Sequence, residues 1–364
     1  MIGVVTTSYP RFPDDGAGVF VRERVRALRA RGEEVEIVAA GNGHTLDDVR
    51  VTRIASGDLF YAGGAPEALE QTRLARRLAA WGQAVGFSCR MIAQLSYRRG
   101  RWHEVESHWL LPCGLAVVAA LPRLPHRAYV HGGDLHLFQR LPWADSLARQ
   151  ICRHRPEIVF ASAQLCERFT ALVGAPIESF GARSRVEAAP FDRALFRRGT
   201  AVEREQARAE LGLVGATVLA AGRLQPIKGF DVLVAAAGRL PPSSRPILVI
   251  AGEGPERARL QHLARAAGID VRLPGLLGQR ALALHMLAAD LFVHPCRTLS
   301  GGRSEGMPLV VREAMARGLR VVASASGGLE EMRGTDGLTL VGEGDVAALA
   351  GAIAQALGSP RVGR

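Results

Sequence analysis

Hydrophobic positions in the first part of the chain alternate between short apolar runs and helical spacing. Residues 3–7 are apolar, residues 34–40 are the next predicted strand, and between them residues 19–31 repeat hydrophobic side chains at helix-like intervals up to Gly32. This order is typical of a β-α-β unit, which builds a parallel sheet with ligand sites at the carboxyl ends of its strands. Further predicted strands are 102–106, 128–130 and 158–162, further helices are 68–96, 114–121, 140–153 and 166–173, and 45–64 suggests a hairpin or irregular strand pair.

The alternation weakens over residues 180–198, which contain Pro190 and many charges, and it restarts at residue 218. We therefore place a linker there and expect two domains, residues 1–185 and 186–364. The second domain has predicted strands at 218–221, 246–251, 271–274, 291–294, 320–323 and 339–341, with helices at 231–239, 255–267, 279–288, 309–317, 328–332 and 345–357. The predicted fold class is α/β, with two doubly wound parallel sheets that face each other across a cleft.

Length and composition agree with a globular chain. The 364 residues suffice for two hydrophobic cores, and 48% of them are hydrophobic. The apolar runs are too short to span a bilayer, and the N-terminus opens on a strand pattern without a charged leader or cleavage site, so we expect a cytoplasmic protein. The five cysteines are scattered without a Cys-x-x-Cys pair, which argues against a disulfide framework or a zinc site.

The net charge of +11 indicates an anionic partner. Aromatic residues are only 5% of the chain and do not interleave with arginines, which argues against nucleic acid. Arginines along residues 73–101 suggest peripheral contact with the anionic inner face of a membrane, although a solvated helix face is the simpler interpretation.

Lysine is nearly absent, since only Lys228 stands among 46 basic residues. It lies with Arg223 in a loop that also contains Gly222, Pro226 and Gly229 and directly follows a predicted strand. A rigid guanidinium fork and a compact ammonium at the carboxyl edge of a sheet suit a diphosphate, whereas a solvated basic turn is the plain alternative. The nearby turn 252–255 is interpreted mainly as a helix cap.

Two carboxylates, Glu305 and Glu313, flank a predicted loop-to-helix transition. Gly306 and Pro308 are typical of a turn and a helix start, and Gly318 follows the helix. Glu305 is therefore expected just before the helix, beside its unpaired N–H groups, and Glu313 about two turns into it. Such a start attracts anions or hydroxyl groups, but a buried junction without function gives the same pattern.

Two histidines, His108 and His131, close predicted strands, and Asp134 follows in a Gly-rich loop. Their position favours a ligand site, although a single histidine is more often structural. A metal site formed by His108, His131, Asp134 and His136 matches no ligand spacing that we can support.

Together these motifs resemble retaining glycosyltransferases of family 4. The resemblance lies in Gly222-Arg223-Leu224-x-Pro226-x-Lys228-Gly229, in Gly252-Glu253-Gly254-Pro255 and in Glu305-x7-Glu313. The opening Thr6–Pro10, Phe20–Glu23 and His131-Gly132-Gly133-Asp134 are similar as well, so nearly the whole chain is covered. A weaker likeness, in His108–Gly114, is to bacterial members that build cell-surface polysaccharide.

The resemblance implies a GT-B fold with two Rossmann-like domains, the C-terminal one holding the donor and the N-terminal one the acceptor. It implies that Arg223 and Lys228 hold the donor diphosphate, that Glu305 binds sugar hydroxyls and that Glu313 binds the ribose. Further implied donor contacts are Arg272 near the base, and Gly306, Met307, Pro308 and Leu309 at the helix start.

In the N-terminal domain the resemblance implies that Gly16 and Gly18 let a loop approach the diphosphate. It places His131 opposite the sugar and implies acceptor contacts for His108 and Asp134. The implied catalytic residues are thus His131, Arg223, Lys228 and Glu305.

Charge develops on the leaving diphosphate, and cations with a helix start stabilise it without a metal or cofactor. Retention is expected through attack on the face from which the diphosphate leaves, with Glu305 as a nucleophile the alternative.

The sequence departs from the family pattern in two places. Arg303 stands where polysaccharide-building members often have an acidic residue, which leaves the donor sugar open. The chain also ends soon after residues 345–357, where relatives commonly continue.

We predict an enzyme, a retaining hexosyltransferase that uses a nucleotide sugar, with UDP-sugar as the expected donor and a glycoside, natural product or lipid-linked glycan as acceptor. The alternative is a non-catalytic GT-B relative that only binds sugar nucleotides or glycans. The first loop of this chain lacks the Gly-x-Gly-x-x-Gly motif, which argues against a Rossmann dehydrogenase. A phosphorylase would need a lysine to bind pyridoxal phosphate, and Lys228, the one lysine of the sequence, is already assigned to the diphosphate.

Overall fold

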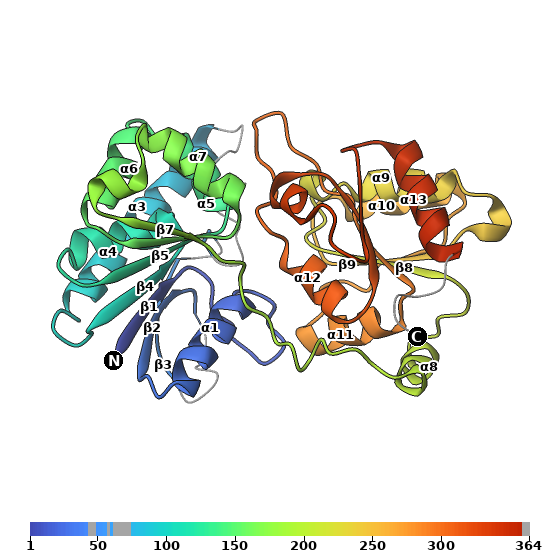
Figure 1. The fold of residues 1–364 in the computed structure, drawn as a ribbon, viewed down its shortest axis with the longest axis horizontal. Helices are drawn as coiled ribbons and strands as arrows, with labels where there is room; N and C mark the ends of the chain where they lie inside the picture. Colours follow the sequence, from blue (N-terminus) through green and yellow to red (C-terminus); the bar gives the residue numbers. More distant parts are fainter. Residues whose placement is uncertain (43–48, 57–58, 61–73, 359–364) are drawn as a thin grey trace. The chain divides into compact units, whose positions relative to one another are not determined.

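The computed structural model describes residues 1–42, 49–56, 59–60 and 74–358. The chain divides into two compact units, Met1–Pro190 and Phe191–Arg364, and Figure 1 shows one parallel sheet flanked by helices in each. The division lies five residues beyond the sequence-based boundary, which falls inside strand β7 (Arg183–Val186).

The first sheet has the strand order β3-β2-β1-β4-β5-β6-β7, and every pair is parallel. The order reverses between β1 and β4, so the loops after these two strands diverge at the carboxyl edge, where open α/β sheets bind ligands. The strands are β1 (Ile2–Thr6), β2 (Val35–Ala40), β3 (Arg50–Ile54), β4 (Glu104–His108), β5 (His126–Val130), β6 (Glu157–Phe160) and β7.

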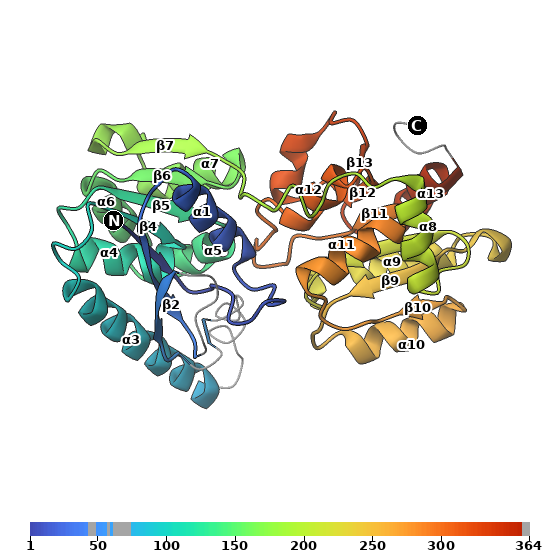
Figure 2. The same cartoon turned by 90° about the horizontal axis from the view of Figure 1, so that it is seen from below.

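Helices cover both faces of this sheet (Figures 1 and 2) and close two hydrophobic layers. One layer contains Val5, Phe87 and Val105, and the other contains Val4, Val21 and Ile37, as expected when alternate side chains of a strand face opposite sides. The helices are α1 (Val19–Ala30), α3 (Leu74–Ser96), α4 (Leu115–Ala120), α5 (Gly133–Gln139), α6 (Ala144–Arg153) and α7 (Ala163–Val173), with short helical turns at Leu110–Gly114 and Ile177–Phe180.

Three sequence-based expectations need correction in this unit. Residues 50–54 pair in parallel with β2, so the hairpin expected over 45–64 is wrong there. The other parts of these two expectations, residues 45–48, 57–58 and 61–64 of the hairpin and residues 68–73 of the expected helix 68–96, lie outside the described residues. The linker expected from residue 180 contains β7, whose four residues are all exposed and therefore give no hydrophobic signal. Helix α5 was not predicted, since Gly132 precedes it and Gly133 is its first residue.

The second sheet has the order β10-β9-β8-β11-β12-β13, again all parallel, and reverses between β8 and β11. Its strands are β8 (Thr217–Ala221), β9 (Ile247–Ala251), β10 (Val271–Arg272), β11 (Leu291–His294), β12 (Arg320–Ser324) and β13 (Leu338–Val341). The predicted class, two parallel-sheet α/β domains, is therefore confirmed.

The helices of the second unit pack apolar layers on both faces of its sheet, one containing Leu233 and Ile353 and the other Phe292 and Val311. They are α8 (Ala201–Glu210), α9 (Phe230–Gly238), α10 (Arg257–Ala267), α11 (Gln279–Ala288), α12 (Leu309–Ala316) and α13 (Val346–Gly358), with 3₁₀ turns at Pro226–Lys228, Pro242–Ser244 and Gly327–Met332. Helix α8 was missed, because only one of its residues is buried, although Thr200 and Glu203 form a capping box at its start.

Candidate functional site

A lysine–glutamate pair lies where the strand order of the second sheet reverses. Lys228 ends the short 3₁₀ turn after β8, and Glu305 lies in the segment between β11 and α12. Lys228 Nζ is 3.0 Å from Glu305 Oε1, with 15% and 20% of the two side chains exposed. Burial, the largest single effect, would raise the pKa of Glu305, but the Lys228 charge acts together with effects of His294, the Lys228 hydrogen bond and Arg303, and the pKa is lowered. Glu305 is therefore a carboxylate at neutral pH and forms an ion pair with Lys228.

Behind this pair lies His294, the last residue of β11, which sequence reasoning did not single out. It is fully buried, and neither ring nitrogen has a hydrogen-bond partner among the described residues. Burial, and then the Lys228 charge, lower its pKa to about 3. The imidazole is thus neutral and leaves Lys228 and Glu305 as the charged groups there.

Close backbone contacts at three glycines hold the loops of this site together. An ideal Cβ on Gly229 would lie 1.9 Å from Pro295 O, one on Gly252 1.9 Å from Gly222 O, and one on Gly327 1.9 Å from Glu305 O. All three have positive φ, which other residues adopt with strain. The turn expected to be a helix cap thus also packs its backbone directly on the loop after β8.

Helix α12 begins at Leu309 with Pro308 as its N-cap, close to the prediction, and its first N–H groups have no intrahelical partner. Gly306 and Met307 precede it. Glu313 is the fifth helical residue, little more than one turn in, so the expected two turns were too many.

Glu313 is 2% exposed, and its Oε1 has no hydrogen-bond partner in the described part of the chain. Burial, partly offset by the Arg312 charge, raises its pKa to about 7. A buried acceptor without a donor is costly in the unliganded protein. It suits a ligand that brings hydroxyl groups, as a ribose does.

The two predicted arginines of this unit differ in placement. Arg223 follows β8 directly and shares its loop with Lys228. Arg272 ends β10, but its guanidinium donates hydrogen bonds to Leu211 O and Gly212 O, at 3.3 and 3.0 Å, in the turn that precedes β8. The structure therefore does not bring Arg272 to the loops around Lys228, and its expected contact with a base gains no support.

The loop after β1 contains the two glycines predicted to approach a diphosphate. Gly18 has φ of 74°, and an ideal Cβ there would lie 2.1 Å from Ser8 O, so this position needs glycine for packing alone. Gly16 has nothing within 4 Å of an ideal Cβ. The Asp15 carboxylate accepts hydrogen bonds from the N–H groups of Arg11 and Ala17 and fixes the loop.

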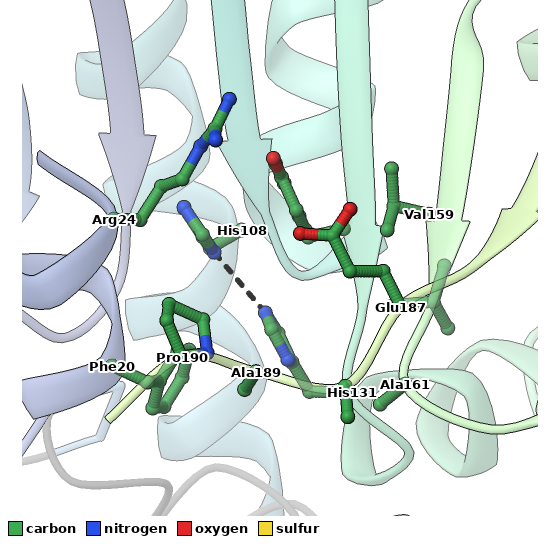
Figure 3. Close-up of a pocket in the computed structure, with 12 residues that line it drawn as sticks. Phe20, Arg24, His108, His131, Val159, Ala161, Glu187, Ala189 and Pro190 are labelled. Carbon is green, nitrogen blue, oxygen red and sulfur yellow. Dashed lines mark hydrogen bonds between the residues drawn. The ribbon is translucent and has the colours of Figure 1, made fainter. Parts of the chain in front are cut away.

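His108 and His131 lie together at the carboxyl ends of β4 and β5 (Figure 3). His108 Nδ1 is 3.2 Å from His131 Nε2, and the His108 ring stacks on Tyr129 with centroids 4.6 Å apart. Burial lowers the pKa of both histidines, to about 3 for His108, where the Arg24 charge adds to the effect. Both rings are neutral, so one donates the shared hydrogen bond and the other accepts it.

A cavity of about 10 Å³, room for roughly one water, adjoins this pair. His108 Nε2 and Tyr129 Oη, both from lining residues, have no hydrogen-bond partner among the described residues. Figure 3 shows Arg24 and Glu187 beside the same space.

Asp134 was expected to contact the acceptor, but its carboxylate serves the backbone. It accepts hydrogen bonds from the N–H groups of Leu110, Gly132 and His131, at 2.8, 3.0 and 3.2 Å. These bonds join the loops after β4 and β5 and position His131. In the described ranges no three His, Cys, Asp or Glu side chains gather in a way that could hold a metal ion.

These features define the class of protein: a two-domain α/β protein with charged loops at the carboxyl edge of each sheet. Residues 203–362 match the family model for glycosyl transferases group 1. The match extends further in a GDP-mannose-dependent alpha-(1-6)-phosphatidylinositol monomannoside mannosyltransferase of Mycolicibacterium smegmatis, 32% identical over 276 residues, 71% of this chain and 69% of the relative. The chain belongs to the glycosyl transferases group 1 family.

The protein of the same name from Mycobacterium tuberculosis is 34% identical over 244 residues, which cover 63% of this chain and 60% of that relative. The match thus spans less than two thirds of the length of that relative. Sucrose-phosphate synthase from Thermosynechococcus elongatus has a similar structure, with a TM-score of 0.72 at 20% identity, covering 98% of this chain and 89% of that one. The predicted GT-B fold is confirmed.

Among the helices of the described ranges, none combines the length and the apolar character that a bilayer crossing requires.

Proposed function

We propose that the protein transfers a sugar from a nucleoside diphosphate sugar to a hydroxyl acceptor with retention of configuration. The observation that carries this proposal is the Lys228–Glu305 ion pair at the point where the second sheet reverses. Helix α12 follows Glu305 and carries Glu313, whose buried Oε1 has no hydrogen-bond partner among the described residues. Glu313 would accept the ribose hydroxyls, Glu305 the sugar hydroxyls, and Lys228 would contact the diphosphate.

The chemistry requires stabilisation of negative charge. As the bond between the anomeric carbon and the diphosphate oxygen breaks, its electron pair goes to the diphosphate. Arg223, Lys228 and the start of α12 would stabilise that charge, and one such preorganised donor is typically worth roughly 3 kcal/mol of barrier. The acceptor oxygen attacks on the same face and its proton passes to the departing diphosphate. Neither a metal nor a cofactor is required by this scheme.

His131 would act from the first unit. As a neutral imidazole fixed by His108 and the Asp134 loop, it can donate or accept a hydrogen bond at the sugar without adding charge. Gly16, with open space beside it, would admit the diphosphate, and the side of His108 facing the cavity would line the acceptor region.

The donor is proposed to be GDP-mannose, with a UDP-sugar as the second candidate. The relatives from Mycolicibacterium and Mycobacterium favour the first, because they are named GDP-mannose-dependent. Similar relatives from Rhodococcus are named D-inositol 3-phosphate glycosyltransferase, a name that states no donor. The names of the GDP-mannose-dependent relatives also specify a phosphatidylinositol mannoside, so a lipid-linked glycan is the proposed acceptor and peripheral membrane contact is part of the proposal.

The test is a calorimetric binding panel of GDP-mannose, UDP-glucose, ADP-glucose and TDP-glucose against wild type, Lys228→Ala and Arg333→Ala. Arg333 is an exposed arginine that forms an ion pair with Glu330 on the surface, so its replacement controls for the lost charge. One donor should bind wild type and Arg333→Ala alike and bind Lys228→Ala about a hundredfold more weakly. A donor that binds all three equally, or no binding by any of them, would contradict the proposal. Tight binding without turnover on any acceptor would favour the non-catalytic alternative.

A further inference from the structure

Helix α3 (Leu74–Ser96) buries only one of its faces. Ala80, Ala84, Phe87, Met91 and Leu95 point into the core of the first unit. Those residues recur at intervals of three or four, as one face of a helix requires. The opposite face lies on the outside of the unit, as Figure 2 shows for the whole helix.

The outer face is apolar where a solvated helix would be polar. Leu78, Trp81 and Val85 are 62%, 40% and 60% exposed. They follow one another at intervals of three and four, so they form a single stripe along α3, which we call the outer stripe. Just beyond the helix, Tyr97 is 71% exposed, with the Arg101 guanidinium 4.9 Å from its ring centre. Exposed apolar residues that gather in this way mark an interaction surface.

The charged residues of α3 and of the turn after it have one sign. Residues 74–103 contain six arginines and no aspartate or glutamate, although the chain as a whole has 35 acidic residues. Arg76, Arg90, Arg99 and Arg101 are exposed. Another exposed tryptophan, Trp143, differs because Asp145 follows it within two residues. The segment around α3 is therefore complementary to an extended anionic surface.

We propose that the outer stripe of α3 rests on a lipid bilayer with anionic headgroups. Leu78 and Val85 would enter the boundary between headgroups and acyl chains, the Trp81 indole would lie at headgroup level, and the arginines would neutralise lipid charge. A second copy of the chain fits less well, because pairing two outer stripes would bring two arginine-rich segments together. The inference rests on the proposed function only in that a lipid-linked acceptor would lie in the same bilayer.

The experiment is co-sedimentation of the full chain with vesicles of phosphatidylcholine alone or mixed with phosphatidylglycerol. The test variant is Leu78→Ser/Trp81→Ser/Val85→Ser, and the matched control is Trp143→Ser, which removes a more exposed tryptophan elsewhere. A charge variant, Arg76→Gln/Arg101→Gln, tests the electrostatic part. Thermal melts verify that each variant is folded.

Wild type and Trp143→Ser should bind the anionic vesicles and hardly bind the neutral ones. The triple variant should bind about tenfold more weakly or worse, since three apolar anchors are lost. The charge variant should bind more weakly, and added salt should weaken wild type. On binding, the tryptophan emission of wild type should shift to shorter wavelength, and the shift should be absent in Trp81→Phe.

The proposal is overturned if wild type does not bind anionic vesicles or if the triple variant binds them as tightly as wild type does. A loss of vesicle affinity in Trp143→Ser as large as that in the triple variant would overturn it as well. It is also overturned if the outer stripe instead drives dimerisation in solution without vesicle binding. Donor binding measured without vesicles should be the same in the triple variant and wild type. Failure of the membrane proposal is thereby separate from failure of the proposed donor site.

Discussion

Replacing Glu313 with glutamine is predicted to stabilise the unliganded protein while weakening nucleotide binding. Burial raises the pKa of this carboxyl from 4.5 to about 7, partly offset by the Arg312 charge. Because the pKa is higher in the folded state, the stabilising contribution is complete below pH 4.5 and is lost as the pH rises through 7. At 1.36 kcal/mol per pH unit, the ionised carboxylate costs the fold roughly 3 kcal/mol at pH 8 and less than about 1 kcal/mol at pH 5.

Glutamine has the shape of glutamate and does not ionise, so Glu313→Gln should recover much of this cost. We expect urea denaturation to give a gain of about 2 kcal/mol at pH 8 and little at pH 5, after allowing for a buried amide. Calorimetry should find nucleoside diphosphate binding about tenfold weaker at pH 8, because a charged acceptor for the ribose is lost.

Glu305→Gln is the matched control, since it changes the other carboxylate of the same motif in the opposite direction. The pKa of Glu305 is lowered, so its contribution to stability is present above its ordinary value of 4.5 and is lost as the pH falls. Glu305→Gln should therefore destabilise the protein at pH 8 by leaving Lys228 unpaired. A loss of stability in Glu313→Gln at pH 8, or an equal gain at pH 5 and pH 8, would refute the reasoning.

Further predictions concern the backbone and the histidine pair. Gly327→Ala should lower the free energy of unfolding, measured by chemical denaturation, by about 1–3 kcal/mol or more, because its Cβ would meet Glu305 O. Gly16→Ala is the control and should leave stability nearly unchanged; equal losses in the two variants would contradict the packing argument. Asp134→Ala should cost about 3 kcal/mol or more, because three backbone N–H groups lose their acceptor, and a melt unchanged from wild type would exclude that role. His108→Phe keeps an aromatic ring stacked on Tyr129 but removes the hydrogen bond to His131, so kcat should fall about tenfold while KM and stability change little. NMR of the His131 ring nitrogens should show an altered tautomer. An unaltered spectrum would contradict the claim that His108 sets the tautomer of His131.

Much of the fold could be predicted from the sequence because buried parallel strands are continuous apolar runs. Strand β11 has the bounds expected, and β8 and α12 start within one residue of theirs. Elements without a buried face were missed, as β7 and α8 show. The parallel pairing of β3 with β2 could not be predicted either, because the direction of pairing depends on residues that are distant in the chain.

The candidate site was predictable where a motif fixes both residue type and loop. Lys228 and Glu305, 77 positions apart, form an ion pair because two strands on either side of the sheet reversal bring their loops together. The orientation of side chains was not predictable. Arg272 ends a strand, but its guanidinium points toward residues 211–212, and the Asp134 carboxylate accepts hydrogen bonds from backbone N–H groups. His294 gave no signal beyond a polar residue ending an apolar strand.

The most direct test of the account is release of nucleoside diphosphate from the donor that binds, measured in the presence of chelator for wild type and Lys228→Ala. We expect slow hydrolysis by wild type that an added acceptor accelerates and that Lys228→Ala abolishes. Hydrolysis at the same rate in Lys228→Ala, or a folded wild type that releases no diphosphate from any donor with any acceptor, would contradict the claim that this ion pair lies at the centre of a glycosyltransferase site.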